Sequence, residues 1–161
     1  MSQSLLTMDS SAERMILGEE LMPLLQERLA AGQTVRYLPF RGVSMLPMLR
    51  QGIDSVELSP LPQRLKKYDL PVYRYPSGKY VMHRVVAVRE DHYLCLGDNT
   101  YEYEKICHDQ MIAVVSAFKR GEKRISVEAL PYRVYCRVWV ASYPLRKLLK
   151  RVKNFLRRLL K

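Results

Sequence analysis

Between about residue 34 and residue 130, apolar and polar side chains alternate in short runs that are separated by turn residues. Alternation of period two places successive side chains on opposite faces of an extended chain, so each run predicts a strand with one buried face. The runs are rich in Val, Ile and Tyr, which favour strands. They cover residues 34–40, 54–61, 70–75, 79–90, 92–99, 110–120 and 123–130.

The turns between these runs are short and contain no helical segment. "YPSGKY" at 75–80 and "REDHY" at 89–93 each have the length of a hairpin connection. Strands that follow one another through tight turns pair antiparallel, whereas parallel strands need a long crossover. We therefore expect a mainly-β fold of antiparallel sheets.

Helical periodicity is confined to the two ends of the chain. Apolar residues repeat on one helical face over residues 11–31, with Gly32 as the stop signal and Pro23 as a site of kinking. A chain of 161 residues has the length of one domain. We expect an N-terminal helical segment at 1–33, a β domain at 34–130 and a basic tail at 131–161.

The tail carries nearly all of the net charge of +11. Residues 131–161 contain 10 Lys and Arg and no acidic residue, whereas residues 1–130 sum to only +1. Residues 143–161 predict an amphipathic helix with eight apolar residues in one stripe and basic residues on the remaining surface. The stripe comprises Leu145, Leu148, Leu149, Val152, Phe155, Leu156, Leu159 and Leu160.

An anionic membrane surface is the partner that this helix fits best, because lipid binding uses both the stripe and the charges. Two alternatives remain open. The stripe can pack on the protein itself or on a protein partner, and the charges alone can bind nucleic acid, which we regard as the less suitable partner.

The cysteines indicate a reducing compartment, and the histidines do not indicate a metal site. Cys95, Cys107 and Cys136 are odd in number and form no CxxC pair, which favours free thiols. His92 and His108 lack the spacing of metal ligands, so no metal or cofactor is expected. The sequence contains no transmembrane run and no secretory signal. We expect a cytoplasmic protein that is peripheral at the membrane.

Three stretches carry groups suited to nucleophilic catalysis. Ser44 lies in "RGVSMLPMLR", a turn in which apolar residues surround one hydroxyl. A serine needs a base, and His83 in "KYVMHRVVAV" is suitable, with Lys79 four residues earlier. "LGDNTYEYEK" supplies Asp98 and Glu104 as acids that can orient a histidine. Taken singly, His83 also fits a core histidine and the "GDN" stretch also fits an ordinary turn.

The order and spacing of "GVSMLPML", "KKYDLPVYRY", "YVMHRVVAV" and "LGDN" resemble the signal peptidase I superfamily of serine peptidases and the related LexA-like self-cleaving repressors. The resemblance spans about residues 37–115. It implies coiled antiparallel sheets, with Ser44 as the nucleophile beside a groove that binds an extended substrate. His83 lies where many members have lysine, as in the branch that uses a Ser-His pair. Asp98 matches the acid of the Gly-Asp-Asn box, and Glu104 matches a second acid of that branch.

The resemblance implies a serine endopeptidase that acts on a peptide or protein. In that hypothesis Ser44 attacks, His83 is the general base, and either Asp98 or Glu104 orients it. The alternative hypothesis is a binding or regulatory module that has the same fold and no catalytic activity.

Overall fold

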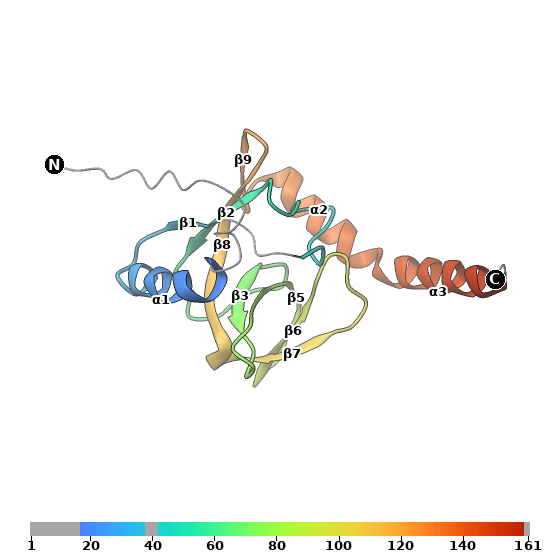
Figure 1. Cartoon of the computed structure of the whole chain (residues 1–161), viewed down its shortest axis with the longest axis horizontal. Coiled ribbons are helices and arrows are strands. Elements are labelled where there is room, and N and C mark those ends of the chain that lie inside the picture. The colour runs from blue at the N-terminus through green and yellow to red at the C-terminus, as the bar shows by residue number, and fades with distance from the viewer. Residues whose placement is uncertain (1–16, 38–41, 160–161) are drawn as a thin grey trace.

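A computed structural model describes residues 17–37 and 42–159 of the chain (Figure 1). The α-helices of this part are α1 (Leu17–Ala30), α2 (Leu130–Ala141) and α3 (Tyr143–Leu159), and His108–Gln110 form a short 3-10 turn. The strands are β1 (Val35–Tyr37), β2 (Ser55–Ser59), β3 (Pro71–Arg74), β4 (Tyr80–Met82), β5 (Arg84–Val88), β6 (His92–Leu96), β7 (Glu104–Cys107), β8 (Met111–Arg120) and β9 (Lys123–Ser126).

The strands form two sheets in which every pairing is antiparallel. The larger sheet has the order β1-β2-β8-β3-β4, with β9 also paired to β8, and the smaller one has the order β5-β6-β7. The predicted antiparallel pairing is therefore confirmed. The architecture is mixed α/β, however, so the expectation of a mainly-β fold is met only loosely.

One large hydrophobic core contains residues from α1, from the larger sheet and from α2. Met22, Leu25 and Leu29 of α1 pack in the same cluster as the larger sheet, together with Tyr132 and Cys136 of α2. Helices α1 and α2 therefore belong to the same hydrophobic core as the larger sheet. A second, smaller cluster that includes Tyr73, Val85 and Ile106 lies between the two sheets.

The run at 79–90 was predicted as one strand, but it forms β4 and β5, with a break at His83. β4 pairs with β3 in the larger sheet, and β5 pairs with β6 in the smaller one. The chain therefore changes sheets at His83, which takes that side chain out of the regular alternation. Strand β7 and helix α2 were not predicted as separate elements.

The helix predicted at 11–31 is described only from Leu17 and ends at Ala30, just before Gly32, whose φ is 76°. A positive φ is easy for glycine and stops a helix. The earlier residues of that prediction lie outside the described part. The tail helix predicted at 143–161 is α3 as far as Leu159, and it extends away from the sheets (Figure 1). The last two residues of that prediction lie outside the described part. No helix in the described ranges is long and apolar enough to cross a bilayer.

Candidate active site

Ser44 lies in a turn whose neighbouring side chains are anchored in the core. Met45, Met48 and Leu49 are buried in the large cluster, while Ser44 itself is partly exposed. The turn is closed by a backbone hydrogen bond of 2.9 Å from the N–H of Leu49 to the carbonyl of Met45. The apolar residues around the serine thus fix the turn and leave its hydroxyl at the surface of a pocket.

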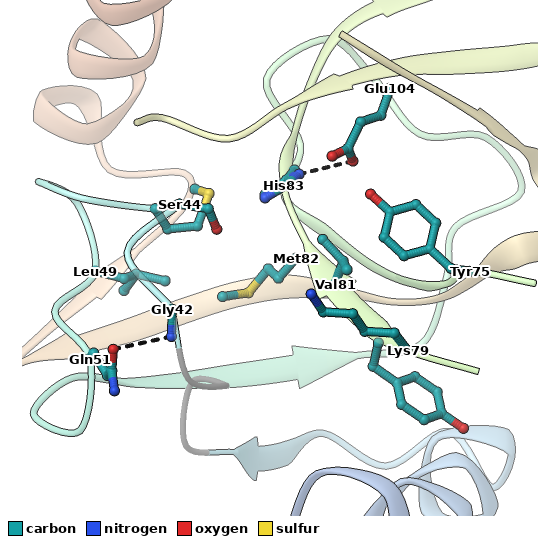
Figure 2. Close-up of a pocket in the computed structure, with 12 residues that line it drawn as sticks. Gly42, Ser44, Leu49, Gln51, Tyr75, Lys79, Val81, Met82, His83 and Glu104 are labelled. Carbon is teal, nitrogen blue, oxygen red and sulfur yellow. Dashed lines mark hydrogen bonds and ion pairs between the residues drawn. The ribbon is translucent and has the colours of Figure 1, made fainter. Parts of the chain in front are cut away.

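That pocket has a volume of about 250 Å³ and is bounded by both sheets and the serine turn. Ser44 and His83 contribute to its wall, as do Glu104, Lys79 and strand β4. Figure 2 shows Ser44 on one side of the imidazole of His83 and Glu104 on the other. The predicted nucleophile, base and one predicted acid are therefore brought together.

His83 is held by Glu104 through its Nδ1 atom. The distance from Nδ1 to Oε2 of Glu104 is 3.0 Å, and the imidazole is almost completely buried. The hydroxyl of Tyr73, a fully buried residue of β3, donates a short hydrogen bond to the same Oε2 and lies 3.1 Å from Nδ1. Tyr73 and Glu104 thus fix the plane of the ring.

This arrangement determines which ring nitrogen carries the proton. A carboxylate can only accept, so Nδ1 of His83 donates to Glu104, and in the neutral imidazole Nε2 then carries the lone pair. Nε2 is the one buried side-chain nitrogen or oxygen in the described residues that has no hydrogen-bond partner. A neutral histidine held in this way is suited to remove a proton from a nearby hydroxyl.

Glu104 remains ionised over a wide pH range. Partial burial would raise the pKa of this carboxyl, but hydrogen bonds from His83 and Tyr73 outweigh burial and lower the pKa from 4.5 to about 2. A carboxylate at this position stabilises the imidazolium that forms when His83 accepts a proton.

Gly97 allows the serine turn and the histidine to approach one another. A methyl group at this glycine would lie 2.8 Å from the carbonyl oxygen of Ser44 and 3.0 Å from Nε2 of His83. The backbone N–H of Asn99 donates a 2.7 Å hydrogen bond to the same carbonyl of Ser44, and its side-chain amide donates to the carbonyl of Val43. The loop after β6 therefore holds the serine turn beside the imidazole.

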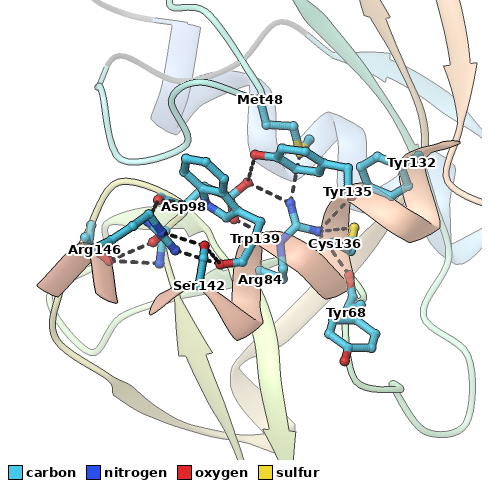
Figure 3. A network of polar contacts seen from close by, with 12 residues as sticks. Met48, Tyr68, Arg84, Asp98, Tyr132, Tyr135, Cys136, Trp139, Ser142 and Arg146 are labelled. Atoms are coloured by element: carbon cyan, nitrogen blue, oxygen red, sulfur yellow. Dashed lines mark hydrogen bonds and ion pairs between the residues drawn. The ribbon is translucent and has the colours of Figure 1, made fainter. Parts of the chain in front are cut away.

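Asp98, the other predicted acid, does not contact His83. Its carboxylate accepts two hydrogen bonds from Arg84, of 2.9 Å and 2.8 Å, and a third of 3.0 Å from the hydroxyl of Tyr135 (Figure 3). The prediction that Asp98 orients His83 is corrected accordingly, since Glu104 is the acid that contacts the imidazole and Asp98 pairs with Arg84. His83 faces the pocket, whereas Arg84, the first residue of β5, faces α2.

The Arg84–Asp98 ion pair is a buried structural element. The exposed fractions of the two side chains are 0% and 2%. Arg84 also donates 2.9 Å hydrogen bonds to the hydroxyl of Tyr132 and to the thiol of Cys136. Burial would lower the pKa of Arg84, but pairing with Asp98 outweighs it and raises the pKa. Removing one member of such a pair leaves an uncompensated buried charge.

The junction of α2 and α3 holds the same loop from outside. The indole N–H of Trp139 donates 2.9 Å to the backbone carbonyl of Asp98, and Arg146 donates 2.8 Å to the same oxygen (Figure 3). The hydroxyl of Tyr143 donates 2.7 Å to the carbonyl of Tyr101. The base of the tail helix is therefore part of the framework of the site.

Sequence reasoning missed Tyr73 and Arg84 as parts of this framework. Tyr73 is one of 11 tyrosines in the chain, and no local pattern distinguishes it. Arg84 follows the predicted base directly, which was the available signal. Lys79, four residues before the predicted base, also lines the pocket, while the ion pairs of Glu104 and Asp98 are with His83 and Arg84. In the described ranges, no group of three His, Cys, Asp or Glu residues is arranged to hold a metal ion.

Comparison of the chain with protein-family models, with curated proteins and with solved structures found no match.

Proposed function

We propose that the protein is a serine endopeptidase of the signal peptidase-like type, in which Ser44 is the nucleophile and His83 the general base. The observation that carries the proposal is the imidazole of His83. Glu104 accepts from its Nδ1, and its Nε2 is unpartnered on the side of the pocket where Ser44 lies. We also propose that the two antiparallel sheets correspond to the coiled sheets of that superfamily.

The reaction has two acyl-transfer steps. Ser44 Oγ attacks the carbonyl carbon of the scissile peptide bond while Nε2 of His83 takes its proton. The resulting imidazolium, paired with Glu104, gives that proton to the leaving amine, and the carbon–nitrogen bond breaks. Water then attacks the acyl-enzyme, again with His83 as base, and releases the carboxylic acid and Ser44. The backbone N–H of Ser44 is our candidate donor to the oxyanion.

The position of β4 supports an extended substrate. β4 ends the strand order of the larger sheet within the described residues, and residues 79–83 line the pocket. A peptide that pairs with this strand edge would run past Ser44. The pocket volume of about 250 Å³ supports small side chains beside the cleaved bond. The free thiols Cys95, Cys107 and Cys136 support a reducing compartment such as the cytoplasm.

The test combines a serine-directed phosphonate probe with a peptide-library digest. We expect the wild-type protein to be labelled once and to cleave peptides, and the Ser44→Ala variant to do neither. Ser77→Ala, at an exposed serine in the β3–β4 turn, is the matched control and should behave as wild type. Equal labelling of both variants would refute Ser44 as the nucleophile.

The second candidate is a binding module that has this fold without catalysis. The observation that favours it is the partial exposure of Glu104, with 26% of its side chain accessible, which weakens its support of an imidazolium. A folded wild-type protein that neither reacts with the probe nor cleaves any library peptide would establish this alternative.

A further inference from the structure

Helices α2 and α3 present a continuous apolar surface to solvent. Its residues follow one another at spacings of three or four, apart from Leu148–Leu149 and Phe155–Leu156, so they lie on one side of a helix. We call this surface the outer stripe. It comprises Leu130, Val134, Val138, Ala141, Leu145, Leu148, Leu149, Val152, Phe155 and Leu156, all of them exposed.

The outer stripe passes through the junction between the two helices. The N–H of Ser142 donates to the carbonyl of Val138, and the N–H of Arg146 donates to the carbonyl of Ser142. These are helical i to i−4 bonds, so the stripe keeps its side across the junction. The prediction for the tail began at residue 143, and the structure extends the apolar surface back to Leu130.

Within the part of the chain that the structure describes, the outer stripe does not pack on other residues of the protein. The opposite face of α2 contacts the core through Tyr132 and Cys136, and the first turn of α3 contacts the site through Tyr143. Beyond that turn, residues 151–158 are all exposed, and Phe155 is 61% exposed. Intramolecular docking, one of the alternatives for the tail, is therefore not observed in this structure.

The charges beside the outer stripe identify its partner. Residues 131–161 carry ten basic and no acidic residues, while residues 1–130 are almost neutral. A protein partner would supply an apolar groove without requiring one sign of charge along the whole helix. Nucleic acid would use the charges but leave ten apolar residues in water. An anionic bilayer interface accepts both, with the stripe among the acyl chains and the basic side chains at the headgroups.

We propose that α2 and α3 bind an anionic lipid surface through the outer stripe, lying parallel to the membrane. The attachment is peripheral. It does not depend on the proposed peptidase activity, so a catalytically inactive protein binds lipid equally well. The site is thereby held at the membrane surface, because Trp139 and Arg146 connect this helical unit to the loop that contains Asp98.

The experiment is vesicle flotation of the full-length Ser44→Ala protein. One set of vesicles contains phosphatidylcholine alone, and the other contains phosphatidylcholine with phosphatidylserine. We expect flotation with the anionic vesicles and little with the neutral ones. A folded protein that floats with neither, or equally with both, overturns the proposal.

Three variants show which side chains contact the lipid. Leu148→Gln, Val152→Gln and Phe155→Gln together remove part of the stripe, and we expect most flotation to be lost. Lys153→Gln with Arg157→Gln removes charge, and binding should weaken about fivefold for each charge removed. The matched control is Leu24→Gln with Ile53→Gln, which changes two exposed apolar residues outside these helices and should leave flotation unchanged.

Two further measurements separate the rival partners. The first is light scattering. If the wild-type protein dimerises, the stripe variant does not, and neither floats with vesicles, the outer stripe binds a second copy of the chain. The second is binding of duplex nucleic acid. If the stripe variant still binds the duplex and the protein does not float with vesicles, the basic side chains bind phosphate. Either result overturns lipid binding. Thermal unfolding of each variant should match wild type, since every side chain substituted in the three variants is exposed in the structure.

Discussion

Replacement of Glu104 by glutamine tests the proposed mechanism most directly. The carboxylate 3.0 Å from Nδ1 of His83 loses its charge, while an amide oxygen remains to accept the hydrogen bond. The wild-type carboxyl has a pKa of about 2 against an ordinary 4.5, and a difference of this size corresponds to about 3 kcal/mol. After subtraction of the burial that opposes them, the hydrogen bonds from Tyr73 and Tyr75 account for about 1 kcal/mol of that difference.

Solvent reduces what remains, because 26% of the Glu104 side chain is exposed. We therefore assign about 1.5 kcal/mol to stabilisation of the imidazolium in the transition state. This corresponds to a decrease in kcat of roughly tenfold for Glu104→Gln, with KM nearly unchanged.

The assay is steady-state cleavage of the best peptide from the library digest. The control is Glu102→Gln, at an exposed neighbouring acid, which should retain wild-type kcat. If the two variants have equal kcat while both are folded, Glu104 does not support the imidazolium and the reasoning fails. A loss confined to KM would instead assign Glu104 to substrate binding.

Four further outcomes follow from the same contacts. Because the pKa of Glu104 is lowered, its stabilising effect is present above pH 4.5 and lost towards pH 2, so wild-type melting temperature should fall more steeply over that range than that of Glu104→Gln. Asp98→Asn should lower the free energy of unfolding by about 3 kcal/mol in denaturant titrations, because it leaves a buried guanidinium unpaired. Gly97→Ala should abolish cleavage, because the added methyl group would clash with the backbone carbonyl of Ser44 and with Cγ2 of Thr100. Thr100→Ser removes the second of these clashes but should not restore cleavage in the double variant, because the backbone clash remains. His83→Ala should remove activity as completely as loss of the nucleophile, with no additive effect in the double variant.

Local periodicity was sufficient to predict most of the strands and the tail helix. The alternation in 110–120 became β8, and the stripe in 143–161 became α3, because in both segments one face is apolar throughout. Helix α2 was missed because it is apolar on two sides. Tyr132 and Cys136 face the core, while Val134 and Val138 face solvent, so its sequence shows no single polar face.

The candidate site was predictable in its residue types but not in its pairings. Glu104 and Asp98 lie six positions apart in one polar stretch, and both suit the role of orienting acid. Which one reaches His83 depends on the two sheets. β7 places Glu104 beside the break after β4, whereas the loop after β6 places Asp98 against Arg84. Such long-range pairings carry no signal in local spacing.

The contacts of Arg84 with α2 set a minimum length for an independently folding version of this protein. A chain that stopped at residue 130 would lose Tyr132, Tyr135 and Cys136, and the buried guanidinium would face water or an open cavity. A chain that stopped after Arg146 would keep every one of those contacts and lose only the distal part of α3. Premature stop codons on either side of this interval would therefore give different phenotypes. An early stop would remove the folded protein, whereas a late stop would leave the contacts of Arg84 intact and remove only the distal half of the outer stripe.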